Sequence, residues 1–166
     1  MNRHAWLVLL FVKAAFLATH AVAEPNAIFL VRHAERAAIS GRVPSDTGLS
    51  AEGKTRAQDL AWELKDAGIA MIFTTEYKRT QETAVPLAES LSIRSEVVPA
   101  DDLRSLIAKI KTATGHVLVV GHSNTLPQII STLGVKERVT IAESDYDNLF
   151  LVVPGRPVRL IHLHYR

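Results

Sequence analysis

Apolar and polar positions alternate along the chain in blocks that predict short buried strands separated by amphipathic helices. The strand candidates are runs of β-branched and other apolar residues bounded by charged or turn residues, which is typical of strands buried on both faces of a sheet. The first run ends abruptly at Arg32, where apolar residues that favour burial are followed by basic residues that can bind an anion. The four runs cover residues 28–31, 69–73, 93–98 and 117–120.

The segments between these runs have the capping residues and apolar spacing of helices. Ser50 is a candidate N-cap for the first predicted helix, and Gly68 is a candidate C-terminal stop for the same helix. Pro86 lies inside the second predicted helix, where proline removes a donor and crowds the preceding turn. The helices are expected from about 50 to 68, from 78 to 91, from 101 or 102 to 110, and from 125 to 133.

This alternation predicts an α/β fold. Strands that alternate with helices imply right-handed crossovers and a mostly parallel central sheet between two helical layers, a three-layer sandwich. The last part of the chain differs, because residues 149–153 and 158–164 are joined by Pro154-Gly155-Arg156-Pro157. That pattern predicts a C-terminal antiparallel hairpin added to the sheet.

The first 23 residues have the pattern of a secretory signal peptide. A basic start is followed by an apolar core interrupted by Lys13, and Ala21-Val22-Ala23 is a small-residue cleavage pattern before Glu24. We therefore expect residues 1–23 to be a signal peptide and residues 24–166 to be one catalytic domain in the periplasm or outside the cell. The alternatives are an uncleaved amino-terminal anchor or a cytosolic start with an ordinary helix.

Charge and cysteine content narrow the classes of partner. The chain has a formal net charge of +2, and without Arg3 and Lys13 the 17 remaining basic residues balance 17 acidic ones. No face has a long basic run, so no nucleic-acid partner is expected. The absence of cysteine from the sequence excludes disulfides, a thiolate nucleophile and cysteine metal ligands.

Basic residues follow three of the predicted strands. Because the carboxyl ends of parallel strands share one edge of a sheet, we expect these residues to meet there. Arginine forks match phosphate oxygens, and a histidine that titrates near neutrality can offer a free ring nitrogen as a nucleophile. The pattern therefore predicts an anion site for phosphoryl transfer, rather than solvated charge at strand ends. The three groups are Arg32 to Arg36, Thr74-Thr75 with Arg79, and Gly121 to Asn124.

These residues resemble the histidine phosphatase superfamily, the phosphoglycerate mutase-like family, in one of its small single-domain members. The resemblance extends over residues 27–165 and rests on four segments in order. They are Val-Arg-His-Ala-Glu-Arg at 31–36, Leu-Ser-Ala-Glu-Gly at 49–53 with Arg56-Ala57, Thr74-Thr75 through Arg-Thr-Gln-Glu-Thr-Ala at 79–84, and Val-Val-Gly-His-Ser-Asn-Thr at 119–125.

The resemblance implies a mechanism and a set of roles. His33 would attack phosphorus and form a covalent phosphohistidine, which water then hydrolyses. No metal or other cofactor is expected, because basic side chains would hold the phosphoryl oxygens. The predicted phosphate-binding residues are Arg32, Arg36, Arg79, His122 and Ser123.

The general acid is the least determined part of the predicted site. In one branch of the family an aspartate follows the second histidine, but Ser123 stands at that position here. In the other branch a glutamate precedes the third helix region, where this chain offers Asp101 and Asp102 as catalytic candidates. Either could instead cap a helix, and Glu35 is a further candidate unless it pairs with Arg36.

Several functions remain open within and beyond this resemblance. The substrate would be a phosphorylated small molecule, glycan or protein, and the enzyme could be a protein phosphohistidine phosphatase or a cell-envelope glycan phosphatase. A mutase is disfavoured because the long insertions of mutases are missing. A phosphate-binding module without turnover is the alternative from another class. A membrane would be met only through the signal segment, and the sequence does not indicate an oligomeric state.

Other conspicuous residues have simpler interpretations. His162 and His164 alternate along one predicted strand without a third ligand spaced to complete a metal site. Trp62 and Tyr77 are interpreted as packing residues. The connections expected over the site, residues 37–48 and 92–100, are short and offer little material for a lid.

Overall fold

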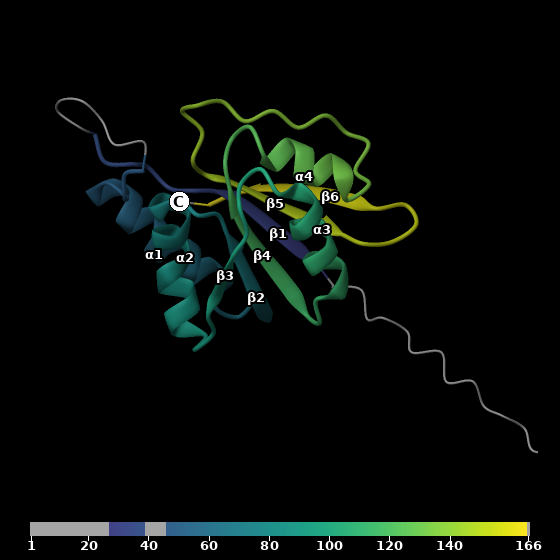
Figure 1. Ribbon diagram of the computed structural model, residues 1–166, viewed down its shortest axis with the longest axis horizontal. Helices are drawn as coiled ribbons and strands as arrows, with labels where there is room; N and C mark the ends of the chain where they lie inside the picture. The colour runs from purple at the N-terminus through teal and green to yellow at the C-terminus, as the bar shows by residue number, and fades with distance from the viewer. Residues whose placement is uncertain (1–26, 39–45, 166) are drawn as a thin grey trace, which may run out of the picture.

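The computed structural model describes residues 27–38 and 46–165, and these form a six-stranded sheet with helices on both faces (Figure 1). The strand order is β3-β2-β4-β1-β5-β6. β1 is parallel to β4 and antiparallel to β5, and β2 is parallel to both of its neighbours. The strands are β1 Ile28–Arg32, β2 Ile69–Thr74, β3 Ser95–Val97, β4 His116–Gly121, β5 Asn148–Val153 and β6 Arg159–His164.

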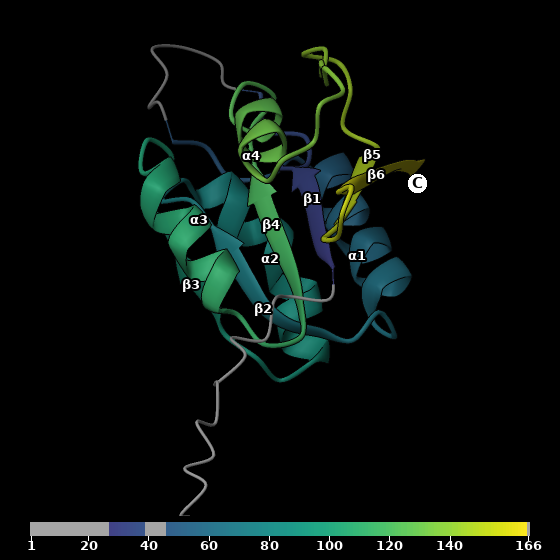
Figure 2. The same ribbon diagram turned by 90° about the vertical axis from the view of Figure 1, so that its right-hand side faces the viewer.

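Within the described residues, four helices complete three layers, as the alternation predicted (Figure 2). α1 and α2 cover one face of the sheet, where Leu60 and Leu87 are fully buried. α3 and α4 cover the other face, where Ile110 and Ile130 are buried. The helices are α1 Ala51–Leu64, α2 Lys78–Ser90, α3 Leu103–Thr112 and α4 Leu126–Thr132.

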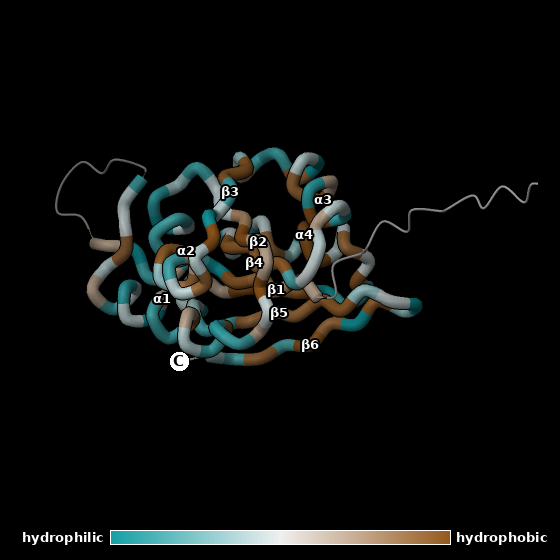
Figure 3. Tube along the Cα trace, turned by 90° about the horizontal axis from the view of Figure 1, so that it is seen from below, coloured by the Kyte–Doolittle hydropathy of each residue, from teal (hydrophilic) through white to brown (hydrophobic). Residues whose placement is uncertain are grey.

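The central strands are apolar on both faces, which explains their continuous hydrophobic runs. In β4, Val117 and Val119 pack in one core while Leu118 and Val120 pack in the other. Figure 3 shows the hydrophobic residues gathered along the middle strands and the hydrophilic residues on the outer helices. Fully burying a side chain of this size stabilises the fold by roughly 1.5–3 kcal/mol, so these strands form its rigid centre.

Local signals predicted most element boundaries. Ser50 caps α1 by accepting a hydrogen bond from the backbone nitrogen of Gly53 at 3.0 Å, as expected. α2 continues through Pro86, because buried residues on both sides of the proline hold that helix in the core. The third strand is shorter than predicted, since Ile93 still donates a backbone hydrogen bond to Ala88 and so completes the turn after α2.

The topology brings the carboxyl ends of β2, β4 and β1 side by side, as the sequence predicted (Figure 2). Arg32 pairs with Gly121 in the parallel register, and the backbone nitrogen of His33 donates to the Gly121 carbonyl at 2.9 Å. The two histidine-bearing strand ends are therefore fixed against each other. The connection from α4 to β5, residues 133–147, also reaches this edge, although no motif in it predicted a role.

The C-terminal hairpin is confirmed, because β5 pairs antiparallel with both β1 and β6. The predicted signal peptide, residues 1–23, and part of the predicted loop at 37–49 lie outside the described residues. Across residues 27–38 and 46–165, no helix has the length and apolar character needed to cross a membrane.

Candidate active site

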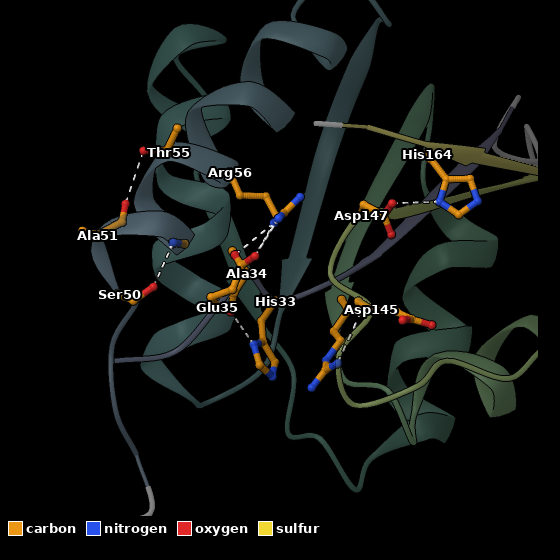
Figure 4. Close-up of polar contacts among 12 residues, drawn as sticks. His33, Ala34, Glu35, Ser50, Ala51, Thr55, Arg56, Asp145, Asp147 and His164 are labelled. Carbon is orange, nitrogen blue, oxygen red and sulfur yellow. Dashed lines mark hydrogen bonds and ion pairs between the residues drawn. The ribbon is translucent and has the colours of Figure 1, made fainter. Parts of the chain in front are cut away.

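His33 leaves β1 directly into an open cavity at the carboxyl edge of the sheet. Its ring Nδ1 lies 2.8 Å from the carbonyl oxygen of Ala34, which can only accept, so Nδ1 carries the proton (Figure 4). The Ala34 backbone nitrogen in turn donates to the Thr83 hydroxyl at 3.0 Å. The ring is thereby held in the tautomer that leaves a lone pair on Nε2.

Burial keeps this imidazole neutral. His33 is only 5 % exposed, and burial lowers its pKa from 6.5 to about 4. The nearby His122, Arg79 and Arg32 lower the pKa further, although the hydrogen bond to Ala34 opposes them. Near neutral pH, His33 is thus a free base beside cations, which is the state that a nucleophile requires.

His122 follows β4 and faces His33, with the two ring centroids 5.3 Å apart. Its Nε2 lies 3.1 Å from the Thr75 hydroxyl, which lies 2.9 Å from the Thr80 hydroxyl. The Thr80 hydroxyl is 2.8 Å from the Tyr77 carbonyl and donates to it. Burial, followed by Arg79 and Arg32, lowers the pKa of His122 to about 4, against the opposing charge of Glu76. Two strand ends and the start of α2 therefore position this ring.

Three arginines line the same cavity: Arg32, Arg36 and Arg79. The guanidinium carbon of Arg79 lies 4.3 Å from the centre of the Tyr77 ring, and its Nε and Nη1 are buried without a hydrogen-bond partner among the described residues. Burial, followed by the charge of Arg36, lowers the pKa of Arg79. Unpaired buried donors are costly, so an anion that accepts from Arg79 would be strongly favoured here.

Arg32 has a second task that the sequence did not indicate. Its Nη1 donates to the carbonyl oxygens of Ala142 at 3.0 Å and Glu143 at 2.8 Å, and its Nη2 donates to the Glu143 carboxylate at 2.9 Å. The Tyr146 ring stacks 4.1 Å from its guanidinium carbon. Arg32 therefore anchors the 133–147 connection at the cavity while it contributes positive charge.

Ser123 lines the cavity, but its hydroxyl is already engaged by the Glu143 carboxylate at 2.6 Å. The residue predicted to bind phosphate thus holds an acidic side chain. Asn124, which follows it, lies in the same lining.

The two acid candidates have different surroundings. The Asp102 carboxylate accepts from the Ser105 backbone nitrogen at 3.0 Å as the N-cap of α3, and hydrogen bonding from Ser105 lowers its pKa. Asp101 is exposed and lines the cavity that holds the two histidines and three arginines. The geometry therefore favours Asp101 as the proton donor and the capping role for Asp102.

Glu35, the further acid candidate, pairs with Arg56 rather than with Arg36. Its carboxylate forms an ion pair with this arginine of α1, with an Nη2–Oε1 distance of 2.6 Å (Figure 4). Gly53 makes this possible, because a Cβ at that position would overlap the Glu35 carbonyl oxygen. Glu35 fastens the chain after His33 to α1 and is occupied as an ion-pair partner.

Sequence reasoning missed Glu143 and Tyr146 and interpreted Tyr77 as a packing residue. Tyr77 lines the cavity, with its ring centre 5.3 Å from that of His122. A usable signal was its position between the end of β2 and Arg79. Glu143 gave no such signal, because it lies in an irregular segment far from every motif.

The arrangement suits a tetrahedral oxyanion. Three guanidinium groups surround two neutral imidazoles, one of which has a free nitrogen, and the unpaired donors belong to arginine. In the part of the chain that the structure describes, no three His, Cys, Asp or Glu side chains gather as a metal-ligand group. The site can therefore bind a phosphoryl group with its own cations and attack it with its own base.

Comparisons with known proteins agree with this chemistry. Residues 28–106 match the sequence pattern of the histidine phosphatase superfamily (branch 1). Over 66 residues the chain is 41% identical to 6-phosphofructo-2-kinase/fructose-2,6-bisphosphatase 1 of Rattus norvegicus. That match spans 38% of this chain and only 14% of the relative.

Three solved structures share the fold. The protein histidine phosphatase SixA, solved with tungstate, superposes with a TM-score of 0.67 at 17% identity, over 83% of this chain and 96% of SixA. The α-ribazole phosphatase of Shigella flexneri gives 0.64 at 18% identity, over 83% and 96%. A mycobacterial glucosyl-3-phosphoglycerate phosphatase gives 0.63 at 13% identity, over 84% and 98%.

The matched pattern spans the strand end that carries His33, the Thr75–Arg79 segment and the acidic pair before α3. The shared fold extends the likeness to 83% of the chain. The chain is therefore similar to the histidine phosphatase superfamily in sequence over residues 28–106, and it shares the fold of the solved phosphatases over most of its length.

Proposed function

We propose that this protein is a metal-independent phosphatase that hydrolyses phosphomonoesters through a phosphohistidine on His33. The observation that carries the proposal is the hydrogen bond from His33 Nδ1 to the Ala34 carbonyl, which leaves Nε2 unprotonated in a cavity lined by arginines. A neutral ring nitrogen beside unpaired guanidinium donors serves nucleophilic attack on phosphorus, and it has no purpose in a purely structural strand end.

The reaction proceeds in two displacements. His33 Nε2 attacks phosphorus while the ester P–O bond breaks, and Asp101 gives its proton to the leaving oxygen. Water then attacks the phosphohistidine, Asp101 takes a proton from that water, and the P–N bond breaks to release inorganic phosphate. Arg36, Arg79 and His122 hold the phosphoryl oxygens during both steps, and they stabilise the charge that spreads over these oxygens.

The substrate class remains a phosphomonoester, with a phosphohistidine protein or an envelope glycan phosphate as narrower candidates. SixA is by its name a protein histidine phosphatase, and another neighbour is named for glucosyl-3-phosphoglycerate. Because the site is an open cavity, a phosphate on a larger molecule can reach His33. Activity against a panel of phosphohistidine peptides, sugar phosphates and aryl phosphates distinguishes these candidates from each other and from a binding module without turnover.

The first prediction concerns the nucleophile. His33→Ala should lower turnover of an aryl phosphate at least about a thousandfold, equal to ~4 kcal/mol of transition-state stabilisation, with chelator present throughout. His116→Ala, at the opposite edge of the sheet, is the control and should keep activity. Quenching the wild type under alkaline conditions should trap a phosphoryl group on the peptide that contains His33. A His33→Ala protein with more than about a hundredth of wild-type turnover would contradict the assignment.

The second prediction concerns pH. Since the folded pKa of His33 and His122 is about 4 and the unfolded value is 6.5, the unfolded chain binds protons first as pH falls. Their contribution to stability is therefore complete above pH 6.5 and is lost between 6.5 and 4. Nuclear magnetic resonance titration of the imidazole protons, assigned with the His33→Ala variant, should give midpoints near 4. Midpoints near 6.5 would show that burial does not lower the pKa of these two imidazoles.

The third prediction separates the two neighbouring aspartates. Asp101→Asn should reduce turnover of an alkyl phosphate far more than that of a nitrophenyl ester, because only the poor leaving group needs a proton. Asp102→Asn is the matched control and should change neither, since asparagine also caps helices well. Measuring kcat for both esters in both variants shows whether Asp101 is the proton donor. A uniform loss in Asp101→Asn would move the acid elsewhere.

We also propose that residues 1–23 direct export and are removed, which places the mature enzyme in the periplasm or outside the cell. The basic start, the apolar core and Ala21-Val22-Ala23 support this proposal. Amino-terminal sequencing of the protein from its native host should begin at Glu24. Intact Met1 in a soluble cytosolic fraction would refute both the cleavage and the location.

A further inference from the structure

The Glu143 carboxylate occupies the mouth of the phosphate cavity without a role in the chemistry proposed above. One oxygen accepts from Arg32 Nη2 at 2.9 Å and the other from the Ser123 hydroxyl at 2.6 Å. Its side chain is 83% exposed, whereas that of Arg32 is 4% exposed. The carboxylate thus contacts a buried cation at the cavity wall while the rest of its side chain is exposed to water.

The backbone that carries this carboxylate is fixed by the site itself. Arg32 Nη1 binds the carbonyl oxygens of Ala142, Glu143 and Asp145, at 3.0, 2.8 and 3.3 Å. The Asp145 carboxylate accepts from the Ala142 backbone nitrogen at 3.2 Å and closes the turn. Glu143 therefore stays beside the cavity even when its own side chain is displaced from Arg32.

A phosphoryl group that reaches Arg32 must compete with this carboxylate for Nη2. Hydrogen bonding from Ser123, followed by the charge of Arg32, lowers the pKa of Glu143 while these contacts last. An exposed carboxylate is also ionised near neutral pH without them, so the displaced group remains an anion. Its charge is then no longer balanced by Arg32. Glu143 lines the exposed part of the cavity, toward which the alcohol part of an ester bound at His33 would extend. A cation on that alcohol would be attracted and a second anion repelled.

We propose that Glu143 is a specificity-determining residue that makes the enzyme select phosphomonoesters whose alcohol carries a cationic group close to the ester. This inference rests on the proposed phosphatase function and deepens it by naming the substrate class. Amino alcohol phosphates and phosphorylated side chains flanked by lysine or arginine belong to this class. Phosphorylated hydroxy acids, which carry a second anion, are disfavoured.

Two phosphonates test the inference without turnover. The compound 2-aminoethylphosphonate carries an ammonium group, phosphonoacetate carries a carboxylate, and neither has an ester bond to hydrolyse. Wild-type protein should bind the ammonium compound more tightly, by roughly tenfold, since one charge acts with opposite sign on the two ligands. Isothermal calorimetry at low ionic strength measures both dissociation constants, and salt should weaken the preference.

Glu143→Gln should bring the two affinities to within about threefold of each other. Removing the competing carboxylate tightens both phosphonates, so the ratio is the readout, and a merely structural role would not change it. Glu137→Gln is the matched control, because Glu137 is an exposed acid in the same connection that does not line the cavity. This control should keep the wild-type ratio.

Kinetics with O-phosphoethanolamine and phosphoglycolate should show the same preference in kcat/KM and the same loss of it in Glu143→Gln. An unchanged ratio in Glu143→Gln, or an equal change in Glu137→Gln, overturns the inference. A hundredfold fall in kcat for every ester in Glu143→Gln also overturns it, because the residue would then act on the reacting atoms. If wild-type protein binds both phosphonates but hydrolyses no ester, the proposed function fails while the binding ratio still tests Glu143.

Discussion

The parallel pairing of β1 with β4 is the constraint on which the rest of the site depends. Because Arg32 lies opposite Gly121, the chain leaves both strands at the same level, and the His33 nitrogen bonds to the Gly121 carbonyl. Two apolar strands buried on both faces cannot slide against each other without exposing their side chains. The hydrophobic core therefore sets the separation of the two imidazoles, and the polar contacts around them refine only their orientation.

A site built in this way is expensive without its ligand. Within the part of the chain that the structure describes, Arg79 keeps two buried donors unpaired, and two histidines are held neutral beside three guanidinium groups. Each unpaired buried donor costs roughly 1–3 kcal/mol, which the surrounding core must offset. An oxyanion that binds here accepts hydrogen bonds from those donors. Its binding therefore removes this cost and stabilises the folded protein. The Glu143 carboxylate supplies a partial substitute on the Arg32 side of the cavity.

The sequence was sufficient for the fold and for much of the site. Continuous apolar runs identified the buried strands. The basic residues directly after them lie on one edge of the sheet because parallel strands have their carboxyl ends at the same edge. The roles of Glu35 and Glu143 could not be predicted from the sequence, and the reason is the same for both. Glu35 pairs with Arg56 and Glu143 with Arg32, and both partnerships join segments at least 21 positions apart without a repeating pattern. Asp101 and Asp102 could not be separated, since only backbone direction decides which one caps α3.

Gly53 shows how far the active site extends beyond the cavity. Helix α1 places no side chain in the cavity lining, yet its backbone passes against the Glu35 carbonyl, two residues beyond the nucleophile. Even a methyl group at this position would have to push that carbonyl, and the strand exit with it, away from the helix. For anyone engineering this scaffold, the outer surface of α1, where Trp62 is exposed, is open to redesign. Gly53 is not, because a side chain there would displace the backbone of Glu35 and so disturb the position of His33.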